Sequence, residues 1–177
     1  MDILILALSS IWLMGPGFIP NNVAAIIGGN IPVDRNKSWR GMRILGDGKT
    51  MRGSITGIIG GILTGLILNS LNPSVEPMTG VKLPHFSYSS MLGLSAGAIV
   101  GDAAGSLLKR RIGIKRGEFL PIVDQLDFLI GAVLITSLIA PKWSSMHLIP
   151  EKLIFLFVGT PVLHIGINKL DEKLEIT

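Results

Sequence analysis

The chain has 177 residues, of which 48% are hydrophobic and 16% charged, with a mean hydropathy of +0.57 and a formal net charge of +4. Soluble globular domains carry about 25% charged residues, so this composition excludes an ordinary soluble domain and predicts a membrane protein. The lack of cysteine excludes disulfide scaffolds and thiolate metal sites.

The gaps between charged residues predict about five membrane-spanning helices, because a bilayer core needs about 20 apolar residues and disfavours charge. In chain order, the predicted spans are residues 3–30, 53–71, 87–108, 122–140 and 153–168. The first span contains Gly15–Gly17 and Pro20–Asn22, which predict a tilted, kinked or locally broken helix. No linker divides the chain, so we expect an all-α integral membrane protein with one domain over residues 1–177.

Two loops hold 11 of the 16 basic residues. They are Arg35, Lys37, Arg40, Arg43, Lys49 and Arg52 in the first loop, and Lys109, Arg110, Arg111, Lys115 and Arg116 in the second. The opposite loops contain only Lys82 and Lys142. The positive-inside rule therefore predicts an outside amino terminus, an inside carboxyl terminus and two basic cytoplasmic loops. Orientation and contact with anionic lipid alone would also account for such loops.

Glycines recur every four residues in the second and third spans. The two series are Gly53, Gly57, Gly61 and Gly65, and Gly93, Gly97, Gly101 and Gly105. Each series lies on one helix face, where small residues let neighbouring backbones approach closely. We therefore predict that both glycine series are helix-packing faces.

A glycine-rich segment directly precedes the second span and runs from Gly46 to Gly53. A turn of this kind before a helix start presents backbone N–H groups to anions, and Lys49 and Arg52 add positive charge. The segment predicts a nucleotide phosphate site. It is not a P-loop, because Arg43 stands where the first glycine is required and no predicted strand precedes it.

Three aspartates are expected at the cytoplasmic edge of the third and fourth spans. Asp102 lies inside a span, where an unpaired carboxylate is unfavourable, and Asp124 and Asp127 share a helix face just after Pro121. Asp124 alone would also be accounted for by stabilisation at a helix amino terminus. Three converging aspartates without a nearby His or Cys favour Mg²⁺, with phosphate and water completing the ligand set.

A longer pattern joins these residues. Gly101-Asp102, Ser106, Lys109-Arg110, Lys115-Arg116, Leu120-Pro121 and Asp124–Asp127 together resemble the carboxy-terminal signature of the CDP-diacylglycerol synthases. The segment Lys49–Gly53 is similar to a Lys-Thr-x-Glu-Gly element of the same superfamily, although Arg52 replaces the Glu. Gln125 also replaces the usual Arg. The small size and the extended first loop most resemble the archaeal branch of the superfamily, the CDP-archaeol synthases.

The resemblance implies Mg²⁺-dependent transfer of a cytidylyl group from CTP to an isoprenoid ether-lipid phosphate, 2,3-bis-O-geranylgeranyl-sn-glycerol 1-phosphate, in phospholipid biosynthesis. It assigns Asp102, Asp124 and Asp127 to the metal, and these residues with Lys49 to catalysis. The residues expected to bind CTP or lipid phosphate are Arg43, Gly46, Asp47, Gly48, Lys49, Thr50, Arg52, Ser106, Lys109, Arg110, Lys115 and Arg116.

The expected partners are CTP, the ether-lipid phosphate and membrane lipids, with no nucleic acid, and the site is expected at the cytoplasmic face of the cell membrane. Two alternatives remain open. A CTP-dependent polyprenol kinase would share the basic loops and the metal site, and a small membrane transporter would also account for Asp102. No residue is selected for recognition of cytosine.

Overall fold

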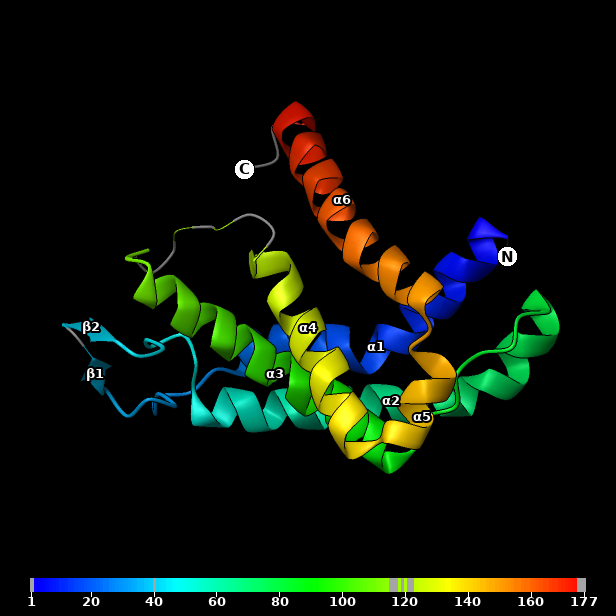
Figure 1. Ribbon diagram of the computed structural model, residues 1–177, viewed down its shortest axis with the longest axis horizontal. Coiled ribbons are helices and arrows are strands. Elements are labelled where there is room, and N and C mark those ends of the chain that lie inside the picture. The colour runs from blue at the N-terminus through cyan, green and yellow to red at the C-terminus, as the bar shows by residue number, and fades with distance from the viewer. Residues whose placement is uncertain (1, 40, 115–117, 119, 121–122, 175–177) are drawn as a thin grey trace.

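The computed structural model describes residues 2–39, 41–114, 118, 120 and 123–174, with side chains described as far as residue 162. Helices dominate these residues (Figure 1). They are α1 (Ile3–Ile27), α2 (Met51–Thr79), α3 (Tyr88–Arg111), α4 (Val123–Ile139), α5 (Pro141–His147) and α6 (Pro150–Leu174). One antiparallel hairpin, β1 (Ser38–Trp39) with β2 (Met42–Arg43), lies in the first basic loop.

The helix starts follow from capping side chains. Asp2 accepts a hydrogen bond from the Leu4 amide (3.1 Å) at the start of α1, and the Thr50 hydroxyl accepts one from the Gly53 amide (3.1 Å) at the start of α2. Ser87 forms a capping box that starts α3. Such caps satisfy the amides that the first turn of a helix leaves unpaired. The sequence therefore sets these starts locally.

The apolar surface of the helices supports a membrane location. In the described residues, α1, α2 and α3 are each long and apolar enough to cross a bilayer. Along α2, Ile55, Ile59, Leu63 and Ile67 recur every four residues and are each more than half exposed. A stripe of large exposed apolar side chains suits contact with lipid. The predicted membrane-embedded helical fold is confirmed, while the number of spans and their orientation stay predictions.

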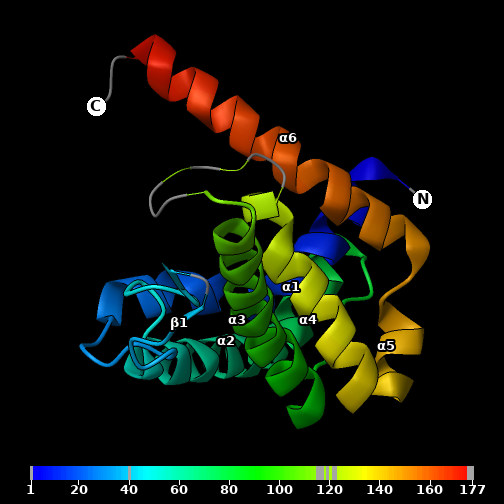
Figure 2. The same ribbon diagram turned by 60° about the vertical axis from the view of Figure 1, so that its left-hand side comes forward.

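Both glycine series face neighbouring helices, as predicted. A Cβ atom added at Gly57 would lie 2.5 Å from the Pro20 carbonyl oxygen of α1, and one added at Gly97 would lie 2.5 Å from the Gly131 carbonyl oxygen of α4. The α1–α2 and α3–α4 pairs are the most extensive helix contacts in the fold. Figure 2 shows α3 and α4 side by side. The missing side chains therefore permit backbone-to-backbone packing.

Helix α1 is continuous through Pro16 and Pro20, so neither proline breaks the first predicted span. Pro20 has no amide hydrogen for the Pro16 carbonyl, which a regular helix would pair with residue 20. The hydroxyl of Ser95, from α3, lies 3.3 Å from that Pro16 carbonyl oxygen and 2.6 Å from the Met91 carbonyl oxygen of its own helix. Because a hydroxyl carries one hydrogen, the Pro16 carbonyl shares this donor and the shorter bond goes to Met91.

Three further features differ from the predictions. Helix α2 continues to Thr79 rather than ending near residue 71, and it carries Pro73 and Pro77 in its last turns. The short helix α5 and the β1–β2 hairpin were not predicted from the sequence. Tertiary contacts connect α2 and α5 to the segment before α3. The Asn69 side chain exchanges two hydrogen bonds of 2.8 Å with the Phe86 backbone, and the Trp143 indole donates to the His85 carbonyl.

Candidate active site

Lys49 and Asp102 meet where the first basic loop touches α3. The Lys49 ammonium donates to the Asp102 carboxylate, and about a quarter of each side chain is exposed. Backbone pairing fixes Lys49, because its carbonyl accepts from the Val33 amide (2.8 Å) and the amide of Met51, two residues later, donates to the Ile31 carbonyl (2.9 Å). The chain leaving α1 therefore positions the lysine at the start of α2.

A cavity of about 290 Å³ opens beside this ion pair. Helices α1, α2 and α3 form its walls, and Gly48, Lys49 and Thr50 line the end at the basic loop. Asp102 contributes from α3, and Asn21 contributes from α1. The remaining lining is largely apolar. The cavity thus combines a charged end with apolar walls, an arrangement typical of small-molecule sites.

Asp127 lies on α4 against the glycine face of α3. Its carboxylate is within electrostatic range of Asp102, Asp124 and Lys49. A Cβ atom added at Gly105 would collide with this carboxylate, so the absent side chain leaves the space that Asp127 occupies. Gly105, the last glycine of the series in α3, therefore leaves room for the Asp127 carboxylate in addition to allowing close helix packing.

Asp124 and Lys109 pair with each other. The Lys109 ammonium donates to the Asp124 carboxylate (2.9 Å) and to the Glu118 carbonyl (3.0 Å), and the Leu120 amide donates to the same carboxylate oxygen of Asp124 (3.0 Å). Less than a quarter of either charged side chain is exposed. These contacts fasten the loop after α3 to the first turn of α4.

The predicted metal ligands are Asp102, Asp124 and Asp127. Within the described part of the chain, no three carboxylate or imidazole side chains lie together in an arrangement that could hold a metal ion. The Asp127 carboxylate is in electrostatic range of both Asp102 and Asp124, and each of these two is paired with a lysine, Lys49 and Lys109. Mg²⁺ typically binds through one or two carboxylates together with substrate phosphates, so fewer than three of these aspartates would be enough to hold it.

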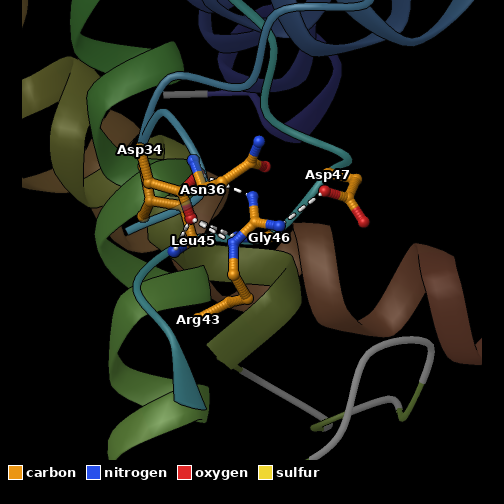
Figure 3. A network of polar contacts seen from close by, with 6 residues as sticks. All are labelled: Asp34, Asn36, Arg43, Leu45, Gly46 and Asp47. Carbon is orange, nitrogen blue, oxygen red and sulfur yellow. Dashed lines mark hydrogen bonds and ion pairs between the residues drawn. The ribbon is translucent and has the colours of Figure 1, made fainter. Parts of the chain in front are cut away.

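Asp34 organises the first basic loop and was not predicted from the sequence. Its buried carboxylate accepts from the Arg43 guanidinium (2.7 and 3.2 Å) and from the amides of Asn36, Leu45 and Gly46 (3.0–3.1 Å), as Figure 3 shows. The Arg43 guanidinium and these amides hold the pKa of Asp34 well below its usual range, despite burial. The signal in the sequence was an acidic residue, one of two with Asp47, in a strongly basic loop.

This network engages several residues that were predicted to bind substrate. Arg43 bridges Asp34 and Asp47, and the distance to the Asp47 carboxylate is 2.8 Å. The Gly46 amide points to Asp34. Gly46 also has a φ of +92°, a left-handed conformation that favours glycine. Arg43, Gly46 and Asp47 therefore shape the loop, while Gly48, Lys49 and Thr50 line the cavity.

The other predicted site residues occupy varied places. Arg52 is exposed on the first turn of α2, and Ser106 is half-buried one turn beyond Asp102. The Arg110 guanidinium donates to the Ile114 carbonyl (2.6 Å) at the end of α3. Lys115 and Arg116 lie outside the described residues. The substrate-binding roles of Arg52, Ser106, Arg110, Lys115 and Arg116 remain predictions.

Arg111 joins the hairpin to α3. Its guanidinium lies 4.6 Å from the Trp39 ring centroid and donates to the Trp39 carbonyl (3.0 Å). Cation–π contact and a hydrogen bond together hold the hairpin over the carboxyl end of α3. The first basic loop is thereby linked to the carboxyl end of α3.

A second hollow runs between α3 and α4 and measures about 430 Å³. Its lining is apolar apart from Asp127, and includes Leu108, Leu126, Ile130 and Leu134. Val100 borders both hollows. An apolar groove with one carboxylate in its lining suits an amphiphilic molecule with a polar head and a hydrocarbon tail.

This chain is similar to known proteins over nearly its full length. A family model described as "CarS-like: CDP-archaeol synthase" matches residues 1–177. CDP-archaeol synthase of Halobacterium salinarum is 42% identical over 176 residues, covering 99% of this chain and 97% of the relative. That of Archaeoglobus fulgidus is 42% identical over 177 residues, covering 97% and 96%.

A solved structure described as an intramembrane enzyme for archaeal membrane lipids biosynthesis superposes with a TM-score of 0.72 at 30% identity, covering 91% of this chain and 93% of that one. The full-length match, the identities near 40% and the shared fold show that this chain belongs to the CDP-archaeol synthase family of membrane-embedded cytidylyltransferases.

Proposed function

We propose that this chain transfers the cytidylyl group of CTP to an isoprenoid ether-lipid phosphate, with Mg²⁺, at the cytoplasmic face of the cell membrane. The observation that carries the proposal is that Lys49 and Asp102 line one cavity, while Asp127, in electrostatic range of both, lines a neighbouring apolar groove. A nucleotide and a lipid phosphate could thus approach the same charged centre from two sides.

The reaction needs no protein base. The second pKa of a phosphomonoester is near 6, so the lipid phosphate is largely a dianion at neutral pH. One of its oxygens attacks the α-phosphorus of CTP, and the bond from that phosphorus to the departing pyrophosphate oxygen breaks. The obstacle is repulsion between two anions, and fixed cations lower it by neutralising charge.

Lys49 is the cation best placed for that role. It is held by backbone pairing on both sides, and its ammonium lies in the cavity beside Asp102. A preorganised lysine binds phosphate oxygens without a large loss of side-chain entropy on binding. Asp102 and Asp127 would hold Mg²⁺, which supplies charge neutralisation and orientation of the phosphoryl group when bound.

The apolar groove between α3 and α4 suits the lipid substrate. Apart from the Asp127 carboxylate, its lining consists of glycine and apolar side chains. An isoprenoid chain lying there would bury apolar surface, with its phosphate near Asp127. The groove's position on helices with lipid-facing side chains also suits entry from the bilayer.

The orientation follows from charge. The first basic loop supplies Lys49 to the pair with Asp102, and Arg111 of the second basic segment contacts Trp39 of the first loop. Positive loops are retained on the cytoplasmic side. We therefore place the site at the cytoplasmic face of a protein that crosses the membrane about five times, with its amino terminus outside. A cysteine introduced at exposed Lys142 should react with an impermeant thiol reagent from outside, and one at exposed Lys37 should not.

The position of a radioactive label tests the function. With α-³²P-labelled CTP and the ether-lipid phosphate, purified protein should transfer label to lipid, and γ-³²P-labelled CTP should give labelled pyrophosphate only. A polyprenol kinase would instead transfer the γ label to lipid. Movement of solute across vesicles without use of CTP would favour the transporter. Either of the last two results would refute the proposal.

A further inference from the structure

Asp34 lies in the segment that leaves α1, and this segment holds the turn that ends at Lys49. The Oδ2 atom of Asp34 accepts from the amides of Leu45 and Gly46 (3.0 Å each), as Figure 3 shows. The neighbouring residue, Val33, donates from its amide to the Lys49 carbonyl (2.8 Å). Two consecutive residues of one segment therefore hold the two ends of the turn.

The turn carries the charged end of the cavity. The Lys49 amide donates to the Gly46 carbonyl (3.4 Å), with Asp47 and Gly48 at the centre of the turn. Gly48 and Lys49 line the cavity of about 290 Å³, and the Lys49 ammonium pairs with Asp102. The position of the turn thus sets where the ammonium lies in the cavity.

Asp34 itself is closed to ligands. Its Oδ1 atom accepts from the Asn36 amide and from Nη2 of Arg43, and its Oδ2 atom accepts from Nε of Arg43 and from the two amides of the turn end. The side chain of Asp34 is only 1% exposed. A substrate could reach these oxygens only by displacing a donor, so any effect of Asp34 on the reaction passes through the loop.

This position requires a carboxylate rather than an amide. All five contacts bring a donor, and a carboxylate accepts through both oxygens, whereas an asparagine accepts through one and donates from its NH₂ group. Arg43 donates to both oxygens of Asp34. In Asp34→Asn, either orientation of the amide would therefore turn its NH₂ group toward the guanidinium and remove two or three of the hydrogen bonds.

We propose that Asp34 is a positioning residue for the nucleotide: it holds the Gly46–Lys49 turn so that the Lys49 ammonium meets the phosphates of CTP. Asp34 acts through Lys49 and does not touch the substrates. This inference rests on the proposed function, because it takes the phosphates of CTP as the ligand of Lys49.

The test compares Asp34→Asn with Glu76→Gln in full-length protein purified in detergent. Displacement by about 1 Å can cost about 100-fold in rate, so Asp34→Asn should lower kcat/KM for CTP at least about tenfold. Glu76 is the matched control, because its carboxylate also accepts from a loop amide, that of Leu83 (2.7 Å), but at the opposite end of α2. Glu76→Gln should leave kcat/KM for CTP unchanged, whatever its thermal stability.

A second measurement separates the positioning of Lys49 from a general loss of structure. Lys49→Ala removes the ammonium that Asp34 is proposed to position. Asp34→Asn should therefore lower kcat/KM for CTP when Lys49 is present, and change it less than about twofold in the Lys49→Ala background. If Asp34 only stabilised the fold, the substitution would lower activity by the same factor in both backgrounds.

A kcat/KM within about twofold of wild type in folded Asp34→Asn would overturn the inference, and so would equal factors in the two backgrounds. If Asp34→Asn does not fold, Gly46→Ala is carried through the same two backgrounds, because the φ of +92° at Gly46 disfavours alanine and strains the same end of the turn. Wild-type protein that fails to transfer the α label from CTP, or folded Lys49→Ala with wild-type activity, would instead refute the proposed function. The two kinds of failure are therefore distinguishable.

Discussion

The Lys49 ammonium and the Asp102 carboxylate form an ion pair across 53 residues of sequence, joining the loop before α2 to α3. Each charge is the other's partner in the free protein, and neither lies in an apolar environment alone. Substrate phosphate and Mg²⁺ would offer new partners to both. The ion pair therefore holds both charged groups in place before the substrates arrive.

Neutralising either member should remove activity without unfolding the protein. We expect Asp102→Asn and Lys49→Ala each to lower the rate of cytidylyl transfer at least about 100-fold, because charge on the reacting phosphates is left unbalanced. The unfolding free energy should change by less than about 1 kcal/mol, as for a partly exposed ion pair. Transfer assays and thermal unfolding in detergent measure the two effects.

Lys142→Ala is the matched control for Lys49→Ala. Lys142 is exposed on α5 and far from the site in sequence, so its removal should leave both KM for CTP and the transfer rate as in wild type. Equal retention of activity in both lysine variants would refute the role of Lys49.

Removal of divalent metal should abolish transfer, and added Mg²⁺ should restore it. In Asp127→Asn, which removes one of two proposed carboxylate ligands, the Mg²⁺ concentration for half-maximal activity should rise at least about tenfold. Asp124→Asn should change that concentration less, because Asp124 pairs with Lys109. A larger effect of Asp124→Asn would assign the metal to Asp124.

Asp34→Asn should destabilise the first basic loop. Asp34 is buried and accepts from a guanidinium and three amides, so loss of its charge should lower the unfolding free energy by about 1–3 kcal/mol. Asp47→Asn removes the other carboxylate that contacts Arg43, but Asp47 is 59% exposed and the change should be within about 0.5 kcal/mol. Thermal unfolding and limited proteolysis of the loop measure the difference.

The pH dependence of stability tests the same network. Arg43 and the loop amides hold the pKa of Asp34 well below its unfolded value of about 3.9, so its contribution is fully present above that value. The contribution is lost as the pH falls toward the folded pKa. Between pH 5 and 3, wild-type protein should therefore lose more stability than Asp34→Asn. Parallel curves for the two proteins would contradict this assignment.

A glycine-to-alanine substitution should have opposite effects on stability inside and outside the glycine series. Gly97→Ala should lower the unfolding free energy by about 1–3 kcal/mol, because the new methyl group would lie 2.5 Å from the Gly131 carbonyl oxygen. Gly159→Ala in α6 meets nothing closer than 3.9 Å and should be neutral or stabilising by up to about 1 kcal/mol, since alanine favours helix. Thermal unfolding decides, and equal effects would show that close packing is not the cause.

The amino-acid sequence by itself determined the membrane location, the approximate positions of the long helices and the faces on which α2 and α3 pack. Hydropathy and the four-residue glycine period are local patterns. Because residues four apart lie on the same face of a helix, such patterns predict which side faces lipid and which side packs against another helix. The motifs around Lys49 and Asp102 also marked the two segments that meet in the site.

Only the tertiary structure decided which polar groups pair. The pair of Asp34 with Arg43 joins an irregular segment to β2, and that of Asp124 with Lys109 joins α4 to α3. No local period relates the sequence distance to the spatial distance in either pair. These pairings depend on how helices and loops come together in space.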